Sequence, residues 1–230
     1  ELLEESEPDL YVLELSSFQL QTTHSLRPAA AVVLNVSADH FDHHRGMEEY
    51  LAAKLRIYRG DGAMILNADE PRLSALRDRQ RRTLYFGVSR PDPGAYGILQ
   101  RDGGAWLARG DRPLISADAL RITGTHNLAN ALAALAMGEA VGLPLEPMLA
   151  VLRRFPGLPH RMQVVAERDG VRWIDDSKGT NVGAAAAAVA GLRGPGLVIL
   201  IAGGIGKGAD FAPLRPALEG RARAVLLMGR

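Results

Sequence analysis

The chain has 230 residues, of which 47% are hydrophobic, and its formal net charge is +1. This length is enough to bury one large core or two modest ones, and the near-neutral charge gives no general reason to expect nucleic acid or an anionic membrane as a partner. Cysteine is absent, which excludes disulfides, thiolate metal sites and a thiol nucleophile.

Nearly continuous apolar runs alternate with helical patterns in the first part of the chain. The runs LYVLEL and AAVVLNV are typical of strands buried on both faces. The segment MEEYLAAKLRIY has helical spacing, with Met47, Leu51, Leu55 and Tyr58 along one side. In chain order we predict a strand at 10–15, a strand at 30–36, a helix at 47–58, a strand ending in a turn at 63–71, a short helix at 71–80 and a strand at 82–87.

Shorter segments with turn signals follow. Residues 95–122 alternate in polarity, with turns at 102–104 and 110–111, and predict an antiparallel appendage. The segment THNLANALAALAMGEAVGLP then predicts a strongly apolar helix at 125–144, capped near Thr125.

The segment FPGLPHR at 155–161 interrupts these patterns and is the best domain boundary. Beyond it, MQVVAE and VRWIDD flank Asp169-Gly170, which predicts a hairpin. A helix at 181–192, a strand at 196–203 and a strand at 224–229 complete the pattern. The fold class is therefore α/β: a domain with a mostly parallel sheet and the antiparallel appendage in residues 1–157, then the start of a second, Rossmann-like domain in residues 158–230.

The two ends suggest a piece of a longer protein. The chain begins at Glu1 instead of Met, and the final AVLLMGR is typical of a buried strand, after which strand–helix alternation predicts a helix. We therefore expect further sequence at both ends. No apolar stretch approaches the roughly 20 residues that span a bilayer, and no secretory signal opens the chain, so we expect a cytoplasmic protein.

The stretch LVILIAGGIGKGADF, at 197–211, is similar to a phosphate loop but does not satisfy its pattern. A Walker loop requires glycine six places before the lysine and a hydroxyl after it, whereas Ile201 and Gly208 occupy these positions around Lys207. The lysine therefore needs another explanation.

Lysine itself is rare in this chain. Of 27 basic residues, 24 are arginine, and the three lysines are Lys54, Lys178 and Lys207. Each is a candidate for a task that arginine cannot perform, such as a compact point charge or an amine that loses its proton.

Candidate metal ligands follow the first two predicted strands. Glu14 interrupts an apolar run near its carboxyl end, where α/β sheets bind ligands, although a salt-bridged structural glutamate is the alternative. Asp39 and His40 follow the second run, and their donor types suit a hard divalent ion. We expect His43 and His44 to be exposed loop residues.

Lys54 flanks the apolar stripe of its helix. Partial burial there would increase its neutral fraction, the state that reacts with carbon dioxide to give a carbamate, which binds magnesium as a carboxylate does. A lysine whose stem lies on apolar surface and whose amine reaches water is the alternative.

Two further clusters of polar residues lie where helices are predicted to begin. Asn127 and Asn130 share one face of a first helical turn, beside His126; two amides can read a purine edge or a ribose, and the helix N-terminus favours an anion. The segment WIDDSKGTNVG lies between a strand and a helix and suggests phosphate or carboxylate handling. Its polar residues are Asp175, Asp176, Ser177, Lys178, Thr180 and Asn181.

Seven segments, in this order, resemble the Mur ligase family: LELSSFQL, LNVSADHFD, AAKLRIY, GTHNLANALAALA, GLPHRMQVV, GVRWIDDSKGTNVGA and GGIGKGADF. The resemblance is greatest to the members that add D-glutamate to UDP-N-acetylmuramoyl-L-alanine in peptidoglycan precursor synthesis. It implies a cytoplasmic, ATP-dependent, ADP-forming amide ligase that uses Mg²⁺ and is monomeric, with no nucleic-acid or membrane partner. It also implies that residues 1–157 are the central ATP-binding domain and residues 158–230 the start of the glutamate ligase domain.

Residue by residue, the resemblance implies a metal site and a carbamylated lysine. Glu14 and His40 match the family's magnesium ligands, and Lys54 matches its carbamylated lysine, which is also a metal ligand. Lys54, His40 and Lys178 are accordingly the implied catalytic residues. Ser16, with Ser17, matches the path of the muramoyl substrate.

The resemblance also implies nucleotide and amino-acid contacts. Asn127 and Asn130 match nucleotide-binding positions, and three residues match groups that reach ATP from the third domain, namely Arg161, Asp176 and Lys178. Thr180 and Lys207 match contacts to the incoming D-glutamate.

Two departures from the family pattern stand out. Ile205 replaces an acid that often precedes the lysine by two positions, and the G-T-N-G-K-[ST] phosphate loop is absent from these residues. We therefore expect the chain by itself to be inactive. The alternatives are a folylpolyglutamate synthase-like or other Mur-type amino-acid ligase, and a non-catalytic nucleotide-binding fragment.

Overall fold

The computed structural model describes residues 8–37, 43–76, 78, 80–192, 194, 196–206 and 209–229. Within these ranges the helices are α1 (Ser17–Thr22), α2 (Met47–Leu55), α3 (Pro71–Ser74), α4 (Thr125–Ala140), α5 (Leu145–Arg154), α6 (Val182–Gly191) and α7 (Leu214–Leu218). The strands are β1 (Ala30–Val32), β2 (Ala63–Asn67), β3 (Thr83–Phe86), β4 (Tyr96–Arg101), β5 (Gly104–Arg109), β6 (Arg112–Ser116), β7 (Gln163–Arg168), β8 (Val171–Asp175), β9 (Val198–Gly203) and β10 (Ala222–Met228).

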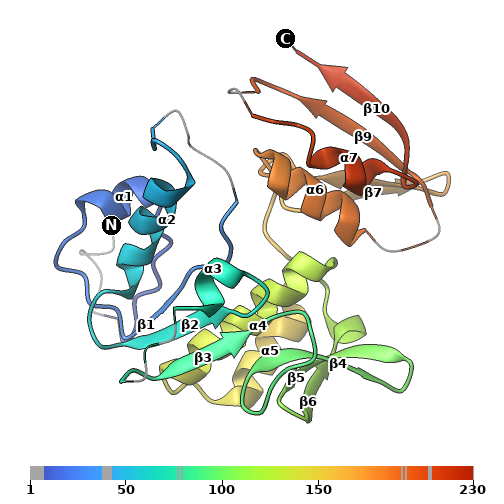
Figure 1. Ribbon diagram of the computed structural model, residues 1–230. Coiled ribbons are helices and arrows are strands. Elements are labelled where there is room, and N and C mark those ends of the chain that lie inside the picture. Colours follow the sequence, from blue (N-terminus) through green and yellow to red (C-terminus); the bar gives the residue numbers. More distant parts are fainter. Residues whose placement is uncertain are drawn as a thin grey trace.

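A six-stranded sheet in the order β1-β2-β3-β4-β5-β6 organises the first half of the chain (Figure 1). The pairs from β1 to β4 are parallel, whereas β4, β5 and β6 pair antiparallel. The predicted antiparallel appendage is thus confirmed, and it continues the parallel sheet instead of forming a sheet of its own. The fold is mixed α/β, as the sequence predicts.

Strand β2 shows why this sheet is covered on both faces. Its side chains alternate between the two faces, so that Ile65 joins a core with α4 and α5 on one side. Leu66 joins a second core with α2 and α3 on the other. Both side chains are fully buried, as the continuous apolar run predicts for a central parallel strand.

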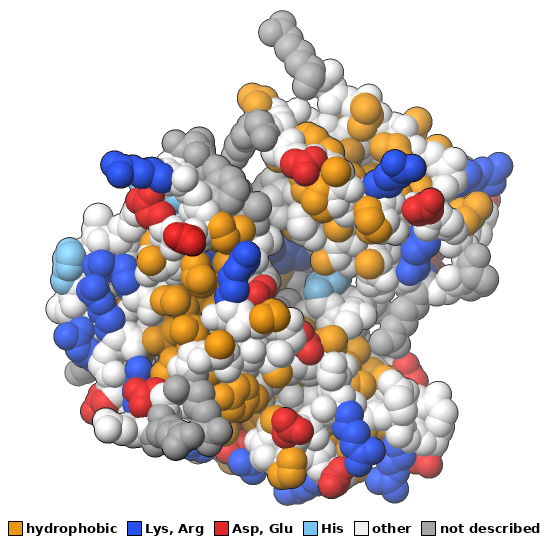
Figure 2. Space-filling view, in the orientation of Figure 1, with side chains coloured by type: hydrophobic (Ala, Val, Ile, Leu, Met, Phe, Trp, Pro, Cys, Tyr) orange, Lys and Arg blue, Asp and Glu red, His pale blue; other side chains and the backbone are white. Residues whose placement is uncertain are grey.

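The second half of the chain forms two small sheets. Strands β7 and β8 make the predicted hairpin, whose turn residues Asp169 and Gly170 both have positive φ. Strands β9 and β10 pair in parallel, and α6 and α7 lie on one side of them (Figure 1). Several large side chains of this region stay exposed, and Figure 2 shows hydrophobic side chains gathered on that part of the surface.

The predicted strand at 10–15 is wrong. Residues 10–15 pair with no described strand, and Val12 is 85% exposed. A parallel strand buried on both faces requires a paired neighbour for its backbone N–H and C=O groups, and β1, the nearest candidate edge, pairs only with β2 among the described strands. The strand predicted at 30–36 is also shorter than expected, since pairing ends at Val32.

Three helices were not predicted from the sequence. Helices α1 and α7 have only 6 and 5 residues, too short for a clear period. Helix α5 follows Pro144, which was expected only to stop the preceding helix. The N-cap of α4 is Gly124, next to Thr125 as predicted, and it makes no side-chain cap bond.

No helix within the described ranges combines the length and apolarity needed to cross a membrane.

Candidate active site

A cavity of about 340 Å³ lies between α1, the segment before it and α2. It brings Lys54 together with Glu14, Ser16 and Ser17, which the sequence also singles out and which lie about 40 positions earlier in the chain. Its complete lining is Glu14, Leu15, Ser16, Ser17, Gln19, Tyr50 and Lys54.

A capping box holds Ser16 at this cavity. Ser16 is the N-cap of α1, and its hydroxyl oxygen accepts a hydrogen bond from the Gln19 N–H at 3.3 Å. In return, the Ser16 N–H donates to Gln19 Oε1 at 2.9 Å. This reciprocal pair satisfies two of the groups that a helix N-terminus leaves open, so the serine has one defined position beside the cavity.

Lys54 and Tyr50 lie one helical turn apart on α2, so their side chains share a face. The Lys54 Nζ lies 5.0 Å from the centroid of the Tyr50 ring, within the range of a cation–π interaction. Lys54 also lies in the last turn of its helix, where the dipole favours a cation. Lys54 is partly buried, as predicted, and its carbamylation stays a prediction.

His44 is buried, which corrects the expectation of an exposed loop residue. Only 1% of it is exposed, its Nε2 is hydrogen-bonded to the Ser17 hydroxyl at 2.9 Å, and its ring lies against those of Phe18 and Tyr50. The loop before α2 turns back onto α1, so the ring fills space behind the cavity wall. His43 is exposed, as expected.

The proposed metal ligands are only partly visible. Glu14 lines the cavity but is exposed and does not lie in a strand. His40 and Asp39 lie outside the described residues. Among the residues that the structure does describe, no three acidic or histidine side chains form a group able to hold a metal ion.

A second set of polar residues lies at the start of α4. Asn127 and Asn130 share one face of its first turn, as predicted, and the Asn130 amide lies 3.5 Å from the Asn127 side-chain oxygen. The Asn127 amide nitrogen donates to the Thr123 carbonyl at 2.7 Å. Both asparagines therefore retain side-chain groups for a ligand, and one of them is oriented by the preceding loop.

His126 contacts both halves of the chain. Helix α6 approaches the beginning of α4 (Figure 1), and the His126 ring lies between Gly124 and Gly191, where a Cβ on either glycine would meet it within about 3.1 Å. Burial lowers the pKa of His126; the charge of Asp176 and a backbone hydrogen bond with Ala187 oppose this. The neutral ring is thus a packed link between α4 and α6.

The predicted loop at 175–180 carries the third set of residues, and its two acids accept several hydrogen bonds. Asp175 accepts from the Ser177 N–H at 2.9 Å and pairs with His160 at 2.7 Å. These two bonds hold the pKa of Asp175 well below its usual range, at about 2. Asp176 accepts from the Met162 N–H at 3.0 Å.

The cations and hydroxyl near this loop face solvent. Arg161, Lys178 and Thr180 are exposed, and Asn181 caps α6 by accepting from the Ala184 N–H at 2.8 Å. The residues on either side of Arg161 are hydrogen-bonded to the loop that carries Asp176 and Lys178. Lys207 lies outside the described residues.

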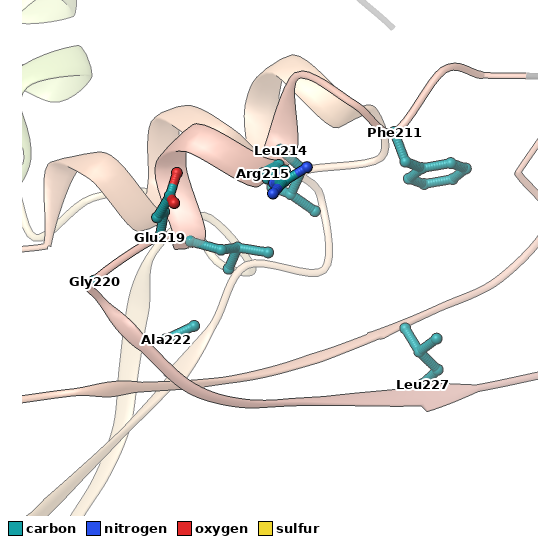
Figure 3. Close-up of a pocket in the computed structure, with 8 residues that line it drawn as sticks. Phe211, Leu214, Arg215, Glu219, Gly220, Ala222 and Leu227 are labelled. Carbon is teal, nitrogen blue, oxygen red and sulfur yellow. The ribbon is translucent and has the colours of Figure 1, made fainter.

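A larger cavity elsewhere contains none of the predicted site residues. It measures about 660 Å³ and lies between α7 and β10, with Leu214 and Phe211 on one side and Leu227 on the other (Figure 3). Its lining is mostly apolar, with Arg215 and Glu219 as the charged members. The family resemblance implies phosphoryl and acyl transfer, which require converging polar groups. On that expectation the smaller, polar cavity is the better candidate site.

Three residues that contact the predicted site residues were not predicted from the sequence. Tyr50 was missed although its spacing of four from Lys54 on a predicted helix is a usable signal. Gln19 could have been found as the last residue of the capping-box pattern S-x-x-Q. His160 carries no sequence signal, because its partner Asp175 is fifteen residues away and is brought near by the β7–β8 hairpin.

Comparison with known proteins gives two family matches. The model described as "Mur ligase middle domain" matches residues 1–138, and "Mur ligase, glutamate ligase domain" matches residues 160–230. The UDP-N-acetylmuramoylalanine--D-glutamate ligase of Nitrosococcus oceani is 56% identical over 230 residues, covering 100% of this chain and 51% of the relative. The enzyme of the same name from Nitrosomonas europaea is 51% identical over 228 residues, covering 97% and 48%. The chain thus spans about half the length of the relatives it matches.

Solved structures share the fold. MurC from Thermotoga maritima aligns with a TM-score of 0.66 at 21% identity, covering 92% of this chain and 47% of that one. MurF from Thermotoga maritima, in complex with ADP, aligns with a TM-score of 0.66 at 19% identity, covering 88% and 53%.

Proposed function

This chain belongs to the Mur ligase family, and from that premise we propose that the protein containing it joins D-glutamate to UDP-N-acetylmuramoyl-L-alanine. The observation that carries the proposal is the match, over the whole chain, to relatives named for this reaction at up to 56% identity. Residues 1–157 would be the central ATP-binding domain and residues 158–230 the start of the glutamate ligase domain. We also propose that the protein containing this chain is cytoplasmic and monomeric.

The proposed reaction has two steps. The substrate carboxylate takes the γ-phosphoryl group of ATP, which releases ADP and leaves an acyl phosphate. The amine of D-glutamate then attacks the acyl carbon, phosphate leaves with the C–O bond electrons, and the nitrogen loses a proton. Both steps depend mainly on positioning and on neutralising phosphate charge.

The residues around the smaller cavity suit Mg²⁺ on one condition. Glu14 supplies a carboxylate, which magnesium prefers, but the Lys54 ammonium has no lone pair and repels a cation. A carbamate on Lys54 would replace that positive charge by two oxygens beside Glu14. Glu14, His40 and carbamylated Lys54 would then hold the ion, which would supply charge neutralisation at the transferred phosphoryl group.

The other residues are proposed to bind and orient the reactants. Ser16, fixed by its capping box, would face the muramoyl substrate. Asn127 and Asn130 would contact the nucleotide. Thr180 and Lys207 would pair with a carboxylate of D-glutamate.

Three residues near the interdomain linker would complete the nucleotide site. Arg161 and Lys178 are proposed to neutralise ATP phosphate charge, with Lys178 acting at the transferred group. Asp176 is proposed to accept hydrogen bonds from the nucleotide. Its Oδ1 already accepts from Met162, which leaves Oδ2 for that role.

Acceptor selectivity in the full-length protein tests this function. ADP release should require UDP-N-acetylmuramoyl-L-alanine and D-glutamate together, and L-glutamate, L-alanine and a diamino acid should each give only background release. Release with L-glutamate and a folate would instead establish the folylpolyglutamate synthase-like alternative. Nucleotide binding without ADP release in any mixture would identify a non-catalytic protein.

A further inference from the structure

The segment that connects α5 to β7 is hydrogen-bonded to the loop at 175–180 through His160 and Met162. His160 Nδ1 and Asp175 Oδ2 are 2.7 Å apart, so the ring donates its N–H to the carboxylate. The Met162 N–H donates to the Asp176 carboxylate at 3.0 Å, and the Lys178 N–H donates to the His160 carbonyl at 3.1 Å. Two consecutive acids thus hold the two residues that flank Arg161.

The backbone on either side of Arg161 is in an uncommon conformation. His160 has φ +63° and Met162 has φ +49°, a left-handed region that residues other than glycine enter rarely. Such a conformation persists where surrounding contacts determine it. The contacts here are the three hydrogen bonds to the loop and a fourth, from the His160 N–H to Gln163 Oε1 at 3.1 Å.

Strand pairing places the acids where these bonds can form. Gln163, the first residue of β7, pairs with Asp175, the last residue of β8. The chain entering β7 therefore runs beside the chain leaving β8. Because Arg161 lies between two held residues, its Cα–Cβ direction is determined by the loop that carries Lys178.

We propose that His160 is a positioning residue, whose hydrogen bond to Asp175 orients Arg161 so that its guanidinium and the Lys178 ammonium converge on the nucleotide phosphates. The inference rests on the proposed function, in which both cations meet ATP. Residues 160–162 are attached to the loop at 175–180 by these hydrogen bonds.

Two substitutions at one position separate the hydrogen bond from the backbone conformation. His160→Gly keeps a residue that tolerates positive φ and removes the side chain. His160→Asn also tolerates positive φ, and its side-chain amide provides an N–H in place of Nδ1. In the full-length protein we expect His160→Gly to lower kcat/KM for ATP about tenfold, as for loss of a charge-assisted hydrogen bond. His160→Asn should retain at least about a third of the wild-type value if most of that bond is restored.

Three further measurements distinguish positioning from general stability. The KM for D-glutamate should stay near the wild-type value in both variants, and the melting temperature should change by less than about 2 °C because His160 is a surface residue. Amide hydrogen exchange at Met162 and Lys178, followed without substrate, should increase in His160→Gly and Asp175→Ala and stay slow in His160→Asn. The hydrogen-exchange comparison does not depend on catalytic turnover.

Specific outcomes would overturn the inference. Equal kcat/KM for ATP in wild type and His160→Gly would remove His160 from nucleotide positioning, and so would equal impairment of the Gly and Asn variants. A protein without ligase activity would refute the proposed function alone. In that case, binding of a non-hydrolysable ATP analogue replaces kcat/KM, and unchanged exchange and binding in His160→Gly would refute the positioning role separately.

Discussion

Tyr58 connects the residue after β1 to the middle of β2 through one hydroxyl group. Its oxygen accepts a hydrogen bond from the Val33 N–H at 2.9 Å and donates one to the Ile65 carbonyl at 2.8 Å, both in the interior. Replacement by phenylalanine preserves the ring and removes the hydroxyl. The Val33 N–H and the Ile65 C=O then lose a buried partner at the point where β1 leads into the segment that carries His40.

The expected loss of stability follows from these two unpaired groups. A buried donor or acceptor left without a partner costs about 1–3 kcal/mol, so Tyr58→Phe should lower the free energy of unfolding by about 3 kcal/mol. For a chain of this size, that corresponds to a fall in melting temperature of about 6–12 °C.

Urea unfolding can be followed in the correct half of the chain. The sequence has two tryptophans, Trp106 in β5 and Trp173 in β8. A Trp173→Phe background leaves Trp106, in the same sheet as β1 and β2, as the fluorescent reporter. Tyr85→Phe is the matched control, because Tyr85 packs against the same core as Tyr58 and its hydroxyl has no hydrogen-bond partner among the described residues.

Alkaline pH gives a second, independent measurement. Burial raises the pKa of Tyr58 to about 12, although its hydrogen bond with Val33 and the charge of Arg81 act in the opposite direction. The folded state therefore favours the neutral phenol. The contribution of the Tyr58 hydroxyl to the free energy of unfolding is complete below pH 10 and is lost as the pH rises from 10 through 12. The stability difference between wild type and Tyr58→Phe should shrink over that interval. Equal losses in Tyr58→Phe and Tyr85→Phe, or a difference independent of pH, would refute the reasoning.

Three further predictions concern other residues. Glu139 accepts hydrogen bonds from Tyr96 at 2.6 Å and from Arg109 at 2.7 Å, so Glu139→Gln should lower the free energy of unfolding by about 1–2 kcal/mol in urea titrations; no change would show that the charge is unimportant. The pKa of His126 is lowered in the folded protein, so its contribution to the free energy of unfolding is complete above the unfolded-state pKa near 6.5 and is lost as the pH falls below that value. Proton NMR of the imidazole ring should show that the ring titrates below about 6.5. Lys54→Arg should abolish ligase activity and the mass increase of one carbon dioxide expected on the wild-type protein, because a guanidinium forms no carbamate.

The sequence predicts well those elements in which the hydrophobic period agrees with the burial that the fold requires. The run at 63–67 and the helix at 47–55 lie where the pattern places them, because period and burial agree there. The apolar run at 10–15 is equally hydrophobic but forms no strand among the described residues, because pairing depends on a neighbour that the run itself cannot encode. The hydrophobic pattern of a segment indicates which side chains it can bury. It does not indicate whether a neighbouring strand is present to pair with its backbone.

The same limit applies to the candidate site. Glu14, Ser16 and Lys54 were singled out from sequence, and the structure places them around one cavity. His44 and His160 could not be assigned in this way, because their partners Ser17 and Asp175 lie 27 and 15 positions away. The nucleotide and D-glutamate contacts stay predictions that depend on the family resemblance.

The close fit of His126 between two glycines has a consequence for how this protein can change over generations. A methyl group at position 191 would lie about 3.1 Å from the imidazole ring and 3.3 Å from the Gly124 Cα, and one at position 124 would lie closer still to the ring. Substitution of Gly191 by a larger residue should therefore be less destabilising after His126 has been replaced by a smaller side chain. Gly124 has φ +95°, which favours glycine whatever occupies position 126. The order of substitutions is thus constrained at one of the two glycines, and the other is restricted independently by its own backbone.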